Sequence, residues 1–212
     1  MKIAITLTTI NIPKVITSYC ESINKLSSNN QYKFIIIGDK KTPNDTNEFI
    51  RKIEENYSIP IQYFDFKNQE RFNNNSSLWK HIPANSFARR NYADILAYYE
   101  DFDFILRIDD DNKPNDIDYF NKLEGAITSN EFSVIESESG WYNICEQLDE
   151  ENNNIFYARG FPYSKRWEPE KINISKIKAK ISLLGGLWYG DPDIDAVTRI
   201  HRTINATKYK RS

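Results

Sequence analysis

Cysteine is scarce in this sequence, since Cys20 and Cys145 are the two thiols among 212 residues. They lie far apart in the chain, which supports neither a disulfide framework nor a cysteine-rich zinc site. An excess of basic charge is also lacking: 28 lysine and arginine residues face 30 aspartate and glutamate residues, a formal net charge of -2. A general nucleic-acid-binding protein is normally basic, so nucleic acid is not an expected partner.

Long apolar runs are lacking as well, and no run approaches the ~20 residues that a membrane-spanning helix requires. The segment from Met1 to Leu7 is too short, and turns polar too soon, for a secretory signal peptide. We therefore expect a cytoplasmic protein without a transmembrane segment. Hydrophobic residues make up 40% of the chain and aromatic residues 14%, which is typical of a packed globular protein. A chain of 212 residues is expected to form one domain.

Hydrophobic periodicity predicts that strands and helices alternate through the first half of the chain. The expected order is strand 2–9, helix to about residue 26, strand 32–39, helix 45–57 with Asp45 as its N-cap, strand 61–66, polar loop 68–77, helix 86–100 and strand 102–108. This alternation is typical of a right-handed, mostly parallel α/β sheet flanked by helices. After residue 112 it loosens: a helix near 116–127 and a strand at 132–136 precede a loop-rich third.

Three consecutive carboxylates, Asp109, Asp110 and Asp111, follow the last strand of the alternating half. Ligands of open α/β sheets bind at the carboxyl ends of the strands, which is where this triplet is expected. If the backbone stays extended, Asp109 and Asp111 face one side, while Asp110 faces the other and braces the turn. Two carboxylates on one side suit Mg²⁺ or Mn²⁺, and the ion relieves their repulsion. The alternative is a solvated acidic turn, since Asp-Asn-Lys-Pro is turn chemistry.

Two dense motifs lie in the loop-rich half, Arg-Gly-Phe-Pro-Tyr-Ser-Lys-Arg from residue 159 and Gly-Gly-Leu-Trp from residue 185. Arg159 and Arg166 supply planar donors that suit a diphosphate or a sugar carboxylate, or they form surface ion pairs. Gly186 allows a close approach of backbone to a ligand. Trp188 either stacks on a sugar face or fills the core.

The strand followed by Asp-x-Asp resembles the GT-A nucleotide-sugar glycosyltransferases, and Ala88-Arg-Arg-Asn91 is similar to a segment that those enzymes carry on the preceding helix. The ordered motifs Asp-Asp-Asp, Arg-Gly-Phe-Pro-Tyr-Ser-Lys-Arg, Gly-Leu-Trp and Pro-Asp-Ile-Asp-Ala resemble the reversibly glycosylated polypeptides, which include the UDP-arabinopyranose mutases. The resemblance spans the back half of the chain, and the front half agrees in topology.

The resemblance implies a GT-A, Rossmann-like domain over residues 1–212, with a nucleotide-sugar-binding half at 1–112 and an acceptor half at 113–212. It implies metal-dependent transfer from a UDP-sugar to a saccharide, lipid-linked or protein acceptor. The alternatives are a UDP-sugar mutase that works through a transient adduct on Arg159, and a sugar-nucleotide-binding or self-glycosylating protein.

The resemblance also implies roles for individual residues. Those expected to bind the nucleotide sugar are Thr8, Thr9, Asp39, Arg89, Arg90, Asn91, Asp109, Asp110, Arg166, Gly186 and Trp188. Those expected to act in catalysis are Asp193, Asp195 and Arg159, and those expected to hold Mn²⁺ or Mg²⁺ are Asp109, Asp111 and His201.

The sequence leaves several of these residue roles open. The choice between Arg89 and Arg90 is open, whereas Asp193 is favoured over Asp195 as the general base because it lies at the entrance of a predicted helix. His201 is either a third metal ligand or an ordinary helix residue. The basic end of the chain is expected to be solvated, with closure over phosphates or peripheral contact with a membrane surface as alternatives.

Overall fold

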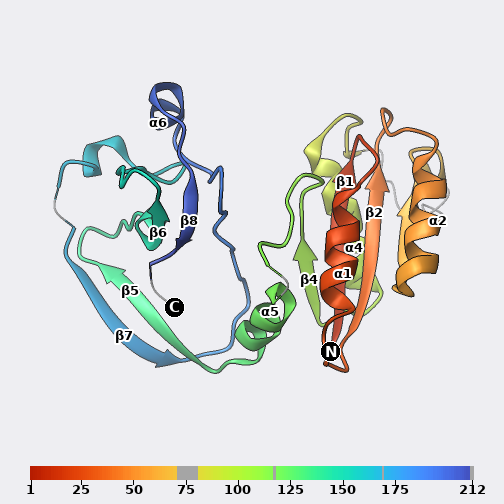
Figure 1. The fold of residues 1–212 in the computed structure, drawn as a ribbon, viewed down its shortest axis with the longest axis horizontal. Helices are drawn as coiled ribbons and strands as arrows, with labels where there is room; N and C mark the ends of the chain where they lie inside the picture. Colours follow the sequence, from red (N-terminus) through yellow and green to blue (C-terminus); the bar gives the residue numbers. More distant parts are fainter. Residues whose placement is uncertain (71–80, 117, 169, 211–212) are drawn as a thin grey trace. The chain divides into compact units, whose positions relative to one another are not determined.

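The structure is a computed structural model that describes residues 1–70, 81–116, 118–168 and 170–210 (Figure 1). The chain divides into two compact units, a first unit at Met1–Lys122 and a second unit at Leu123–Ser212. The division falls ten residues after residue 112, the boundary expected between two halves of one domain. That the whole chain forms a single domain stays a prediction.

The first unit is built on a parallel sheet of four strands. These strands are β1 (Lys2–Thr9), β2 (Gln31–Gly38), β3 (Ile61–Phe64) and β4 (Phe104–Arg107). They pair in the order β3-β2-β1-β4, and every pair is parallel. The predicted α/β alternation is thereby confirmed, and the arrangement is compatible with a Rossmann-like fold.

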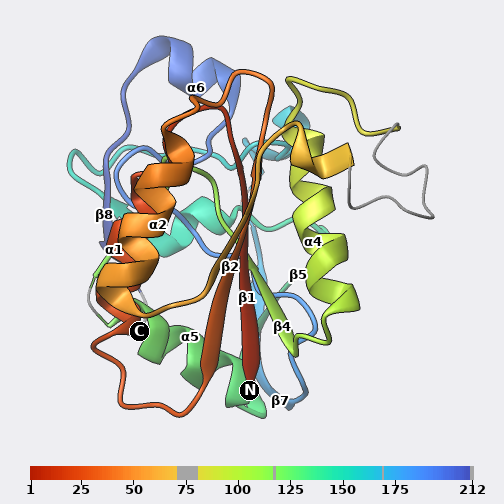
Figure 2. The same cartoon turned by 90° about the vertical axis from the view of Figure 1, so that its right-hand side faces the viewer.

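Helices cover both faces of this sheet, as Figure 2 shows. Helices α1 (Val15–Ile23) and α2 (Thr46–Tyr57) lie on one face, and α4 (Arg90–Tyr99) lies on the other after the short turn η2 (Phe87–Arg89). Helix α5 (Tyr119–Thr128) contains the residues at which the two units are divided. Burial on both faces explains why β2 contains the uninterrupted run from Phe34 to Ile37, in which no side chain is exposed.

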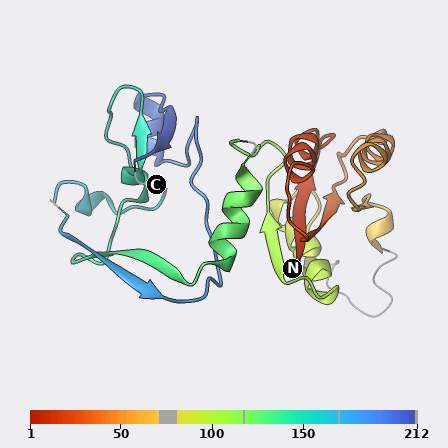
Figure 3. The ribbon, with the colours of Figure 1, turned by 60° about the horizontal axis from the view of Figure 1, so that its bottom comes forward.

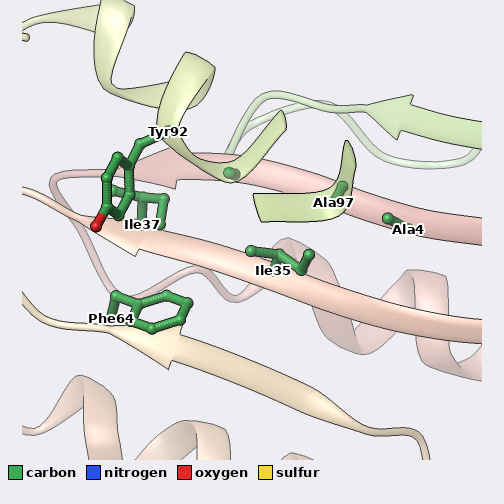
Figure 4. Packing of buried hydrophobic residues seen from close by; sticks show 7 residues of the cluster. Ala4, Ile35, Ile37, Phe64, Tyr92 and Ala97 are labelled. Carbon is green, nitrogen blue, oxygen red and sulfur yellow. The ribbon is translucent and has the colours of Figure 1, made fainter. Parts of the chain in front are cut away.

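One core cluster joins α4 to the sheet (Figure 4). Helix α4 contributes Tyr92 and two alanines, and the sheet contributes apolar side chains from its first three strands. The buried members are Ala4, Ile35, Ile37, Phe64, Tyr92, Ala93 and Ala97. Alanine brings little side-chain volume, so α4 packs close to the strands and its first residues lie near the sheet edge.

Two details of the first unit differ from the sequence prediction. Helix α2 begins after Asp45 as expected, but the Asp45 side chain makes no capping hydrogen bond, because its backbone is already helical at φ -72° and ψ -6°. The predicted loop at 68–77 begins instead with the short turn η1 (Asn68–Glu70), and its residues 71–77 lie outside the described part of the chain.

The second unit contains two antiparallel strand pairs connected by irregular segments. Strands β5 (Glu131–Ser137) and β7 (Ile172–Lys178) form a long ribbon, visible in Figure 3, and β6 (Leu148–Glu150) pairs with β8 (Ala206–Tyr209). The short turns η3 (Ile144–Gln147) and η4 (Tyr163–Lys165) and helix α6 (Ala196–His201) complete the unit. A second core cluster consists of Cys145, Leu148, Phe156, Ile194, Ile204 and Ala206.

None of the helices formed by the described residues has both the length and the apolar character needed to span a bilayer.

We expect Ile35→Ala to lower the free energy of unfolding by about 2–5 kcal/mol, because it leaves a cavity beneath α4. Ile105→Ala is the matched control, since Ile105 lies on the edge strand β4 and is 41% exposed. Its cost should stay below about 1 kcal/mol. Urea denaturation followed by circular dichroism measures both, and equal losses would contradict the assigned core.

Candidate functional site

The carboxyl ends of β1, β2 and β4 meet at one edge of the parallel sheet, because β1 pairs with both neighbours in the same direction. Thr9 ends β1, and its hydroxyl donates a hydrogen bond of 2.6 Å to Oδ2 of Asp110. This contact ties the acidic triplet after β4 to the end of β1. It is the contact expected of a residue that braces the turn.

The triplet does not continue the strand. Strand β4 ends at Arg107, and the backbone N–H of Asn112 donates to the carbonyl of Asp109 at 3.3 Å, which closes a turn. The backbone is therefore not extended through the triplet, which was the condition of the expected alternation, and the shared metal role of Asp109 and Asp111 stays a prediction. Pairing of β4 with β1 ends at Arg107, and residues 109–112 are all Asp or Asn, which favour turns.

Asp109 has a cationic partner, since Nη2 of Arg90 lies 2.8 Å from its Oδ1. Burial raises the pKa of Tyr19 above its ordinary value, and the nearby Tyr119 and the charge of Asp109 raise it further. Asp111 is exposed and makes no hydrogen bond or ion pair with any described residue. The three neighbouring carboxylates therefore have three different surroundings.

The structure separates the roles of Arg89 and Arg90. Arg89, the last residue of η2, is buried and donates to the carbonyl of Ile82 at 3.2 Å and to the side chain of Gln69. Burial lowers the pKa of Arg89, an effect that the charge of Asp39 partly offsets. Arg89 thus anchors the chain before α4, and Arg90 is the arginine at the acidic turn. Asn91 is exposed on α4.

Asp39 is buried at the end of β2, where its carboxylate accepts backbone hydrogen bonds from Lys40 (2.6 Å), Asn85 (2.9 Å) and Ser86 (3.2 Å). These bonds fix the chain that leads into α4. Thr8 donates to the carbonyl of Ile37 at 3.0 Å. Both side chains support the sheet edge, and their predicted contacts with a nucleoside stay predictions.

Carboxylate oxygens at the acidic turn are the ligands that Mg²⁺ and Mn²⁺ prefer. Within the described ranges, no group of three or more histidine, cysteine, aspartate or glutamate side chains is gathered so as to hold a metal ion. Mg²⁺ commonly uses one or two carboxylates and takes its other ligands from water and phosphate. The donors of Asp109 and Asp111 fit such an ion in their chemistry.

The second unit contains a pocket of about 180 Å³ in which four predicted site residues meet. Arg159, Gly186, Trp188 and Asp193 come from three separate motifs and line this pocket together. Its other lining residues are Ile144, Cys145, Leu148, Ala158, Leu187 and Pro192. Trp188 is 44% exposed and so belongs to the pocket wall instead of the core.

Arg159 and Asp193 form an ion pair at the pocket, with 2.5 Å between Nη2 and Oδ1. An antiparallel bridge between Ala158 and Ile194 brings their two segments together. Cys145 was missed by sequence reasoning, because nothing near it in the sequence marks it. Burial raises the pKa of its thiol to about 11, so this side chain is a neutral, weakly polar part of the wall.

Arg166 and Asp195 form a second pair, with 3.3 Å between Nη2 and Oδ1 and both side chains buried. The guanidinium lies 4.5 Å from the ring centroid of Tyr157 and 3.8 Å from that of Tyr163. Asp195 caps α6, accepting from the backbone N–H of Thr198 at 3.0 Å and from its hydroxyl at 2.5 Å.

A helix begins after residues 191–195 as predicted, but the residue at its entrance is Asp195 and not Asp193. Of the two, Asp193 lines the pocket. His201 is the exposed last residue of α6. Its predicted metal role stays a prediction.

A scan of protein-family models finds no match to this chain, and a search of curated proteins finds none either.

The environment of Asp195 predicts a pH-dependent stability. Burial alone raises the pKa of this carboxyl, but hydrogen bonds from Thr198 and the charge of Arg166 outweigh burial and lower the pKa below its ordinary value. Its contribution to stability is therefore present above the unfolded-state pKa of about 3.9 and is lost as pH falls through the lower folded-state pKa.

We expect Asp195→Asn to lower the midpoint of thermal unfolding at pH 7, with a difference from the parent protein that shrinks below about pH 4. Asp191→Asn is the control, since Asp191 is exposed and pairs with Arg199 at the surface. Calorimetry across pH 2–7 measures both variants. A difference for Asp195→Asn that is constant over this range would contradict the assignment.

Proposed function

We propose that the protein is a metal-dependent glycosyltransferase of the GT-A type that uses a UDP-sugar donor. One observation carries the proposal: the acidic turn at Asp109–Asp111 lies at the carboxyl edge of a parallel α/β sheet, tied to the end of β1. Nucleotides bind at such edges, and a diphosphate there needs a counter-charge.

The first unit supplies the nucleotide site in this proposal. Asp109 and Asp111 would hold Mn²⁺ or Mg²⁺, which neutralises the charge of the leaving diphosphate when bound. Asp110 keeps the turn in place through Thr9. Arg90, beside Asp109, provides a planar cation that matches phosphate oxygens.

Asp193 is the proposed general base, the role that the motif resemblance implies for it. Asp193 is a carboxylate on the pocket wall, where it is ion-paired with Arg159. In an inverting transfer, the acceptor oxygen bonds to the anomeric carbon while the bond from that carbon to the diphosphate breaks. The hydroxyl proton passes to Asp193, and UDP leaves. Trp188 offers an aromatic face of the kind on which sugars stack.

A second candidate function rests on Arg159, whose side chain is 77% exposed at the pocket. A mutase that carries a sugar adduct on Arg159 requires this side chain to be accessible, and so does a self-glycosylating protein. The two candidates share the donor and differ in where the sugar goes.

Incubation with radiolabelled UDP-sugars and Mn²⁺ tests the proposal. Free sugar, isomerised nucleotide sugar and protein-bound label are quantified separately. We expect slow sugar release that EDTA abolishes, and we expect Asp193→Asn to reduce transfer to an added acceptor about 10²–10⁴-fold, the usual contribution of a general base. Asp191→Asn is a matched control on the same segment, because Asp191 is exposed and does not line the pocket.

The remaining outcomes separate the rival functions. Ring-contracted nucleotide sugar supports a mutase, and label fixed on Arg159 without turnover supports a self-glycosylating protein. If no UDP-sugar is consumed and no label is bound, the proposed function is wrong.

A further inference from the structure

Arg90 is ion-paired with a carboxylate oxygen of Asp109, one of the two residues proposed to bind the metal ion. It is the first residue of α4, and its Nη2 lies 2.8 Å from Oδ1 of Asp109. Its Nε is buried and makes no hydrogen bond within the described part of the chain. The guanidinium is thus held mainly by Asp109 and has an unused donor.

The three carboxylates of the turn differ in how they are held. Asp110 is bound to Thr9 at 2.6 Å, within the sheet edge. Asp111 is exposed and is without a partner among the described residues. Asp109 is held by an ion pair whose side chains are 24% and 39% exposed, so water and ions can reach it. Such a pair is weak enough to be exchanged.

A guanidinium and a divalent cation compete for one carboxylate, because two cations on the same anion repel each other. A diphosphate changes this balance, since it offers the guanidinium a new anion with the oxygen geometry that suits its planar donors. Arg90 then loses little when it leaves Asp109.

We propose that Arg90 is an exchangeable counter-ion that couples metal binding to nucleotide binding. Without ligands it neutralises Asp109. When UDP and the divalent cation are both present, Asp109 exchanges Arg90 for the cation, and Arg90 pairs with a diphosphate oxygen. The inference rests on the proposed function, because it requires a diphosphate and a divalent cation at this sheet edge.

This exchange couples the binding of the two ligands. The diphosphate draws Arg90 away from Asp109, and the cation frees Arg90 to pair with the diphosphate. UDP tightens Mn²⁺ binding, and Mn²⁺ tightens UDP binding by the same factor. A metal site without this competitor binds Mn²⁺ more tightly on its own and gains less from UDP.

Mn²⁺ affinity is measured by electron paramagnetic resonance of free Mn²⁺, with and without UDP, for the full chain. We expect UDP to tighten Mn²⁺ binding by about tenfold or more in the parent protein. In Arg90→Gln, Mn²⁺ alone should bind about tenfold tighter than in the parent, and the gain from UDP should be smaller than in the parent by the same factor. Arg51→Gln is the control, because Arg51 pairs with Glu55 on the exposed face of α2, and it should match the parent in both respects.

Arg90→Lys tests the same exchange with a variant that keeps the charge. Lysine still competes for Asp109 but lacks the planar fork, so Mn²⁺ alone should bind as in the parent while the gain from UDP falls. Thermal unfolding verifies that each variant is folded. If Arg90→Gln does not fold, Arg90→Lys provides the test.

The outcomes distinguish failure of the inference from failure of the proposed function. If the parent protein binds UDP and Mn²⁺ but Arg90→Gln binds both in the same way, the inference is wrong and the nucleotide site stands. If the parent binds neither UDP nor Mn²⁺, both are wrong.

Discussion

Parallel pairing of β1 with β2 on one side and with β4 on the other determines where the polar residues of the first unit gather. Because these strands run in one direction, the residues that follow them, Asp39 and Asp109–Asp111, leave the sheet at the same edge. Helices on both faces bury β1 and β2, so the polar side chains of these strands meet water or a ligand at the edge.

In each of the two units, ion pairs between arginine and aspartate differ in how accessible they are to a ligand. Arg166 and Asp195 are buried, with two tyrosine rings beside the guanidinium and a helix cap on the carboxylate, so this pair belongs to the framework. The pair of Arg90 with Asp109 and the pair of Arg159 with Asp193 are partly exposed. Breaking such a pair costs little free energy. Chemistry is therefore expected at these two places.

Elements with strong apolar periodicity could be predicted from the sequence. The buried apolar residues of β1, β2 and α4 recur at the spacing typical of a strand or a helix. The predicted order and positions of these three elements are confirmed. The order of the motifs indicated a shared role for Arg159, Trp188 and Asp193, but the pocket at which they meet depends on how distant loops fold together. The turn at Asp109 and the different partners of Arg89 and Arg90 likewise depend on contacts with segments distant in the sequence, such as those with Thr9 and Gln69, which local patterns do not predict.

Calorimetric titration of UDP into the protein, with Mn²⁺ and again with EDTA, tests the central claim that the acidic turn is a metal-dependent nucleotide site. We expect saturable UDP binding with Mn²⁺, and binding at least about tenfold weaker with EDTA and in Asp111→Ala. Asp45→Ala, which removes an exposed carboxylate without a capping bond, should bind like the parent. UDP affinity that is unchanged by EDTA and by Asp111→Ala would contradict the account.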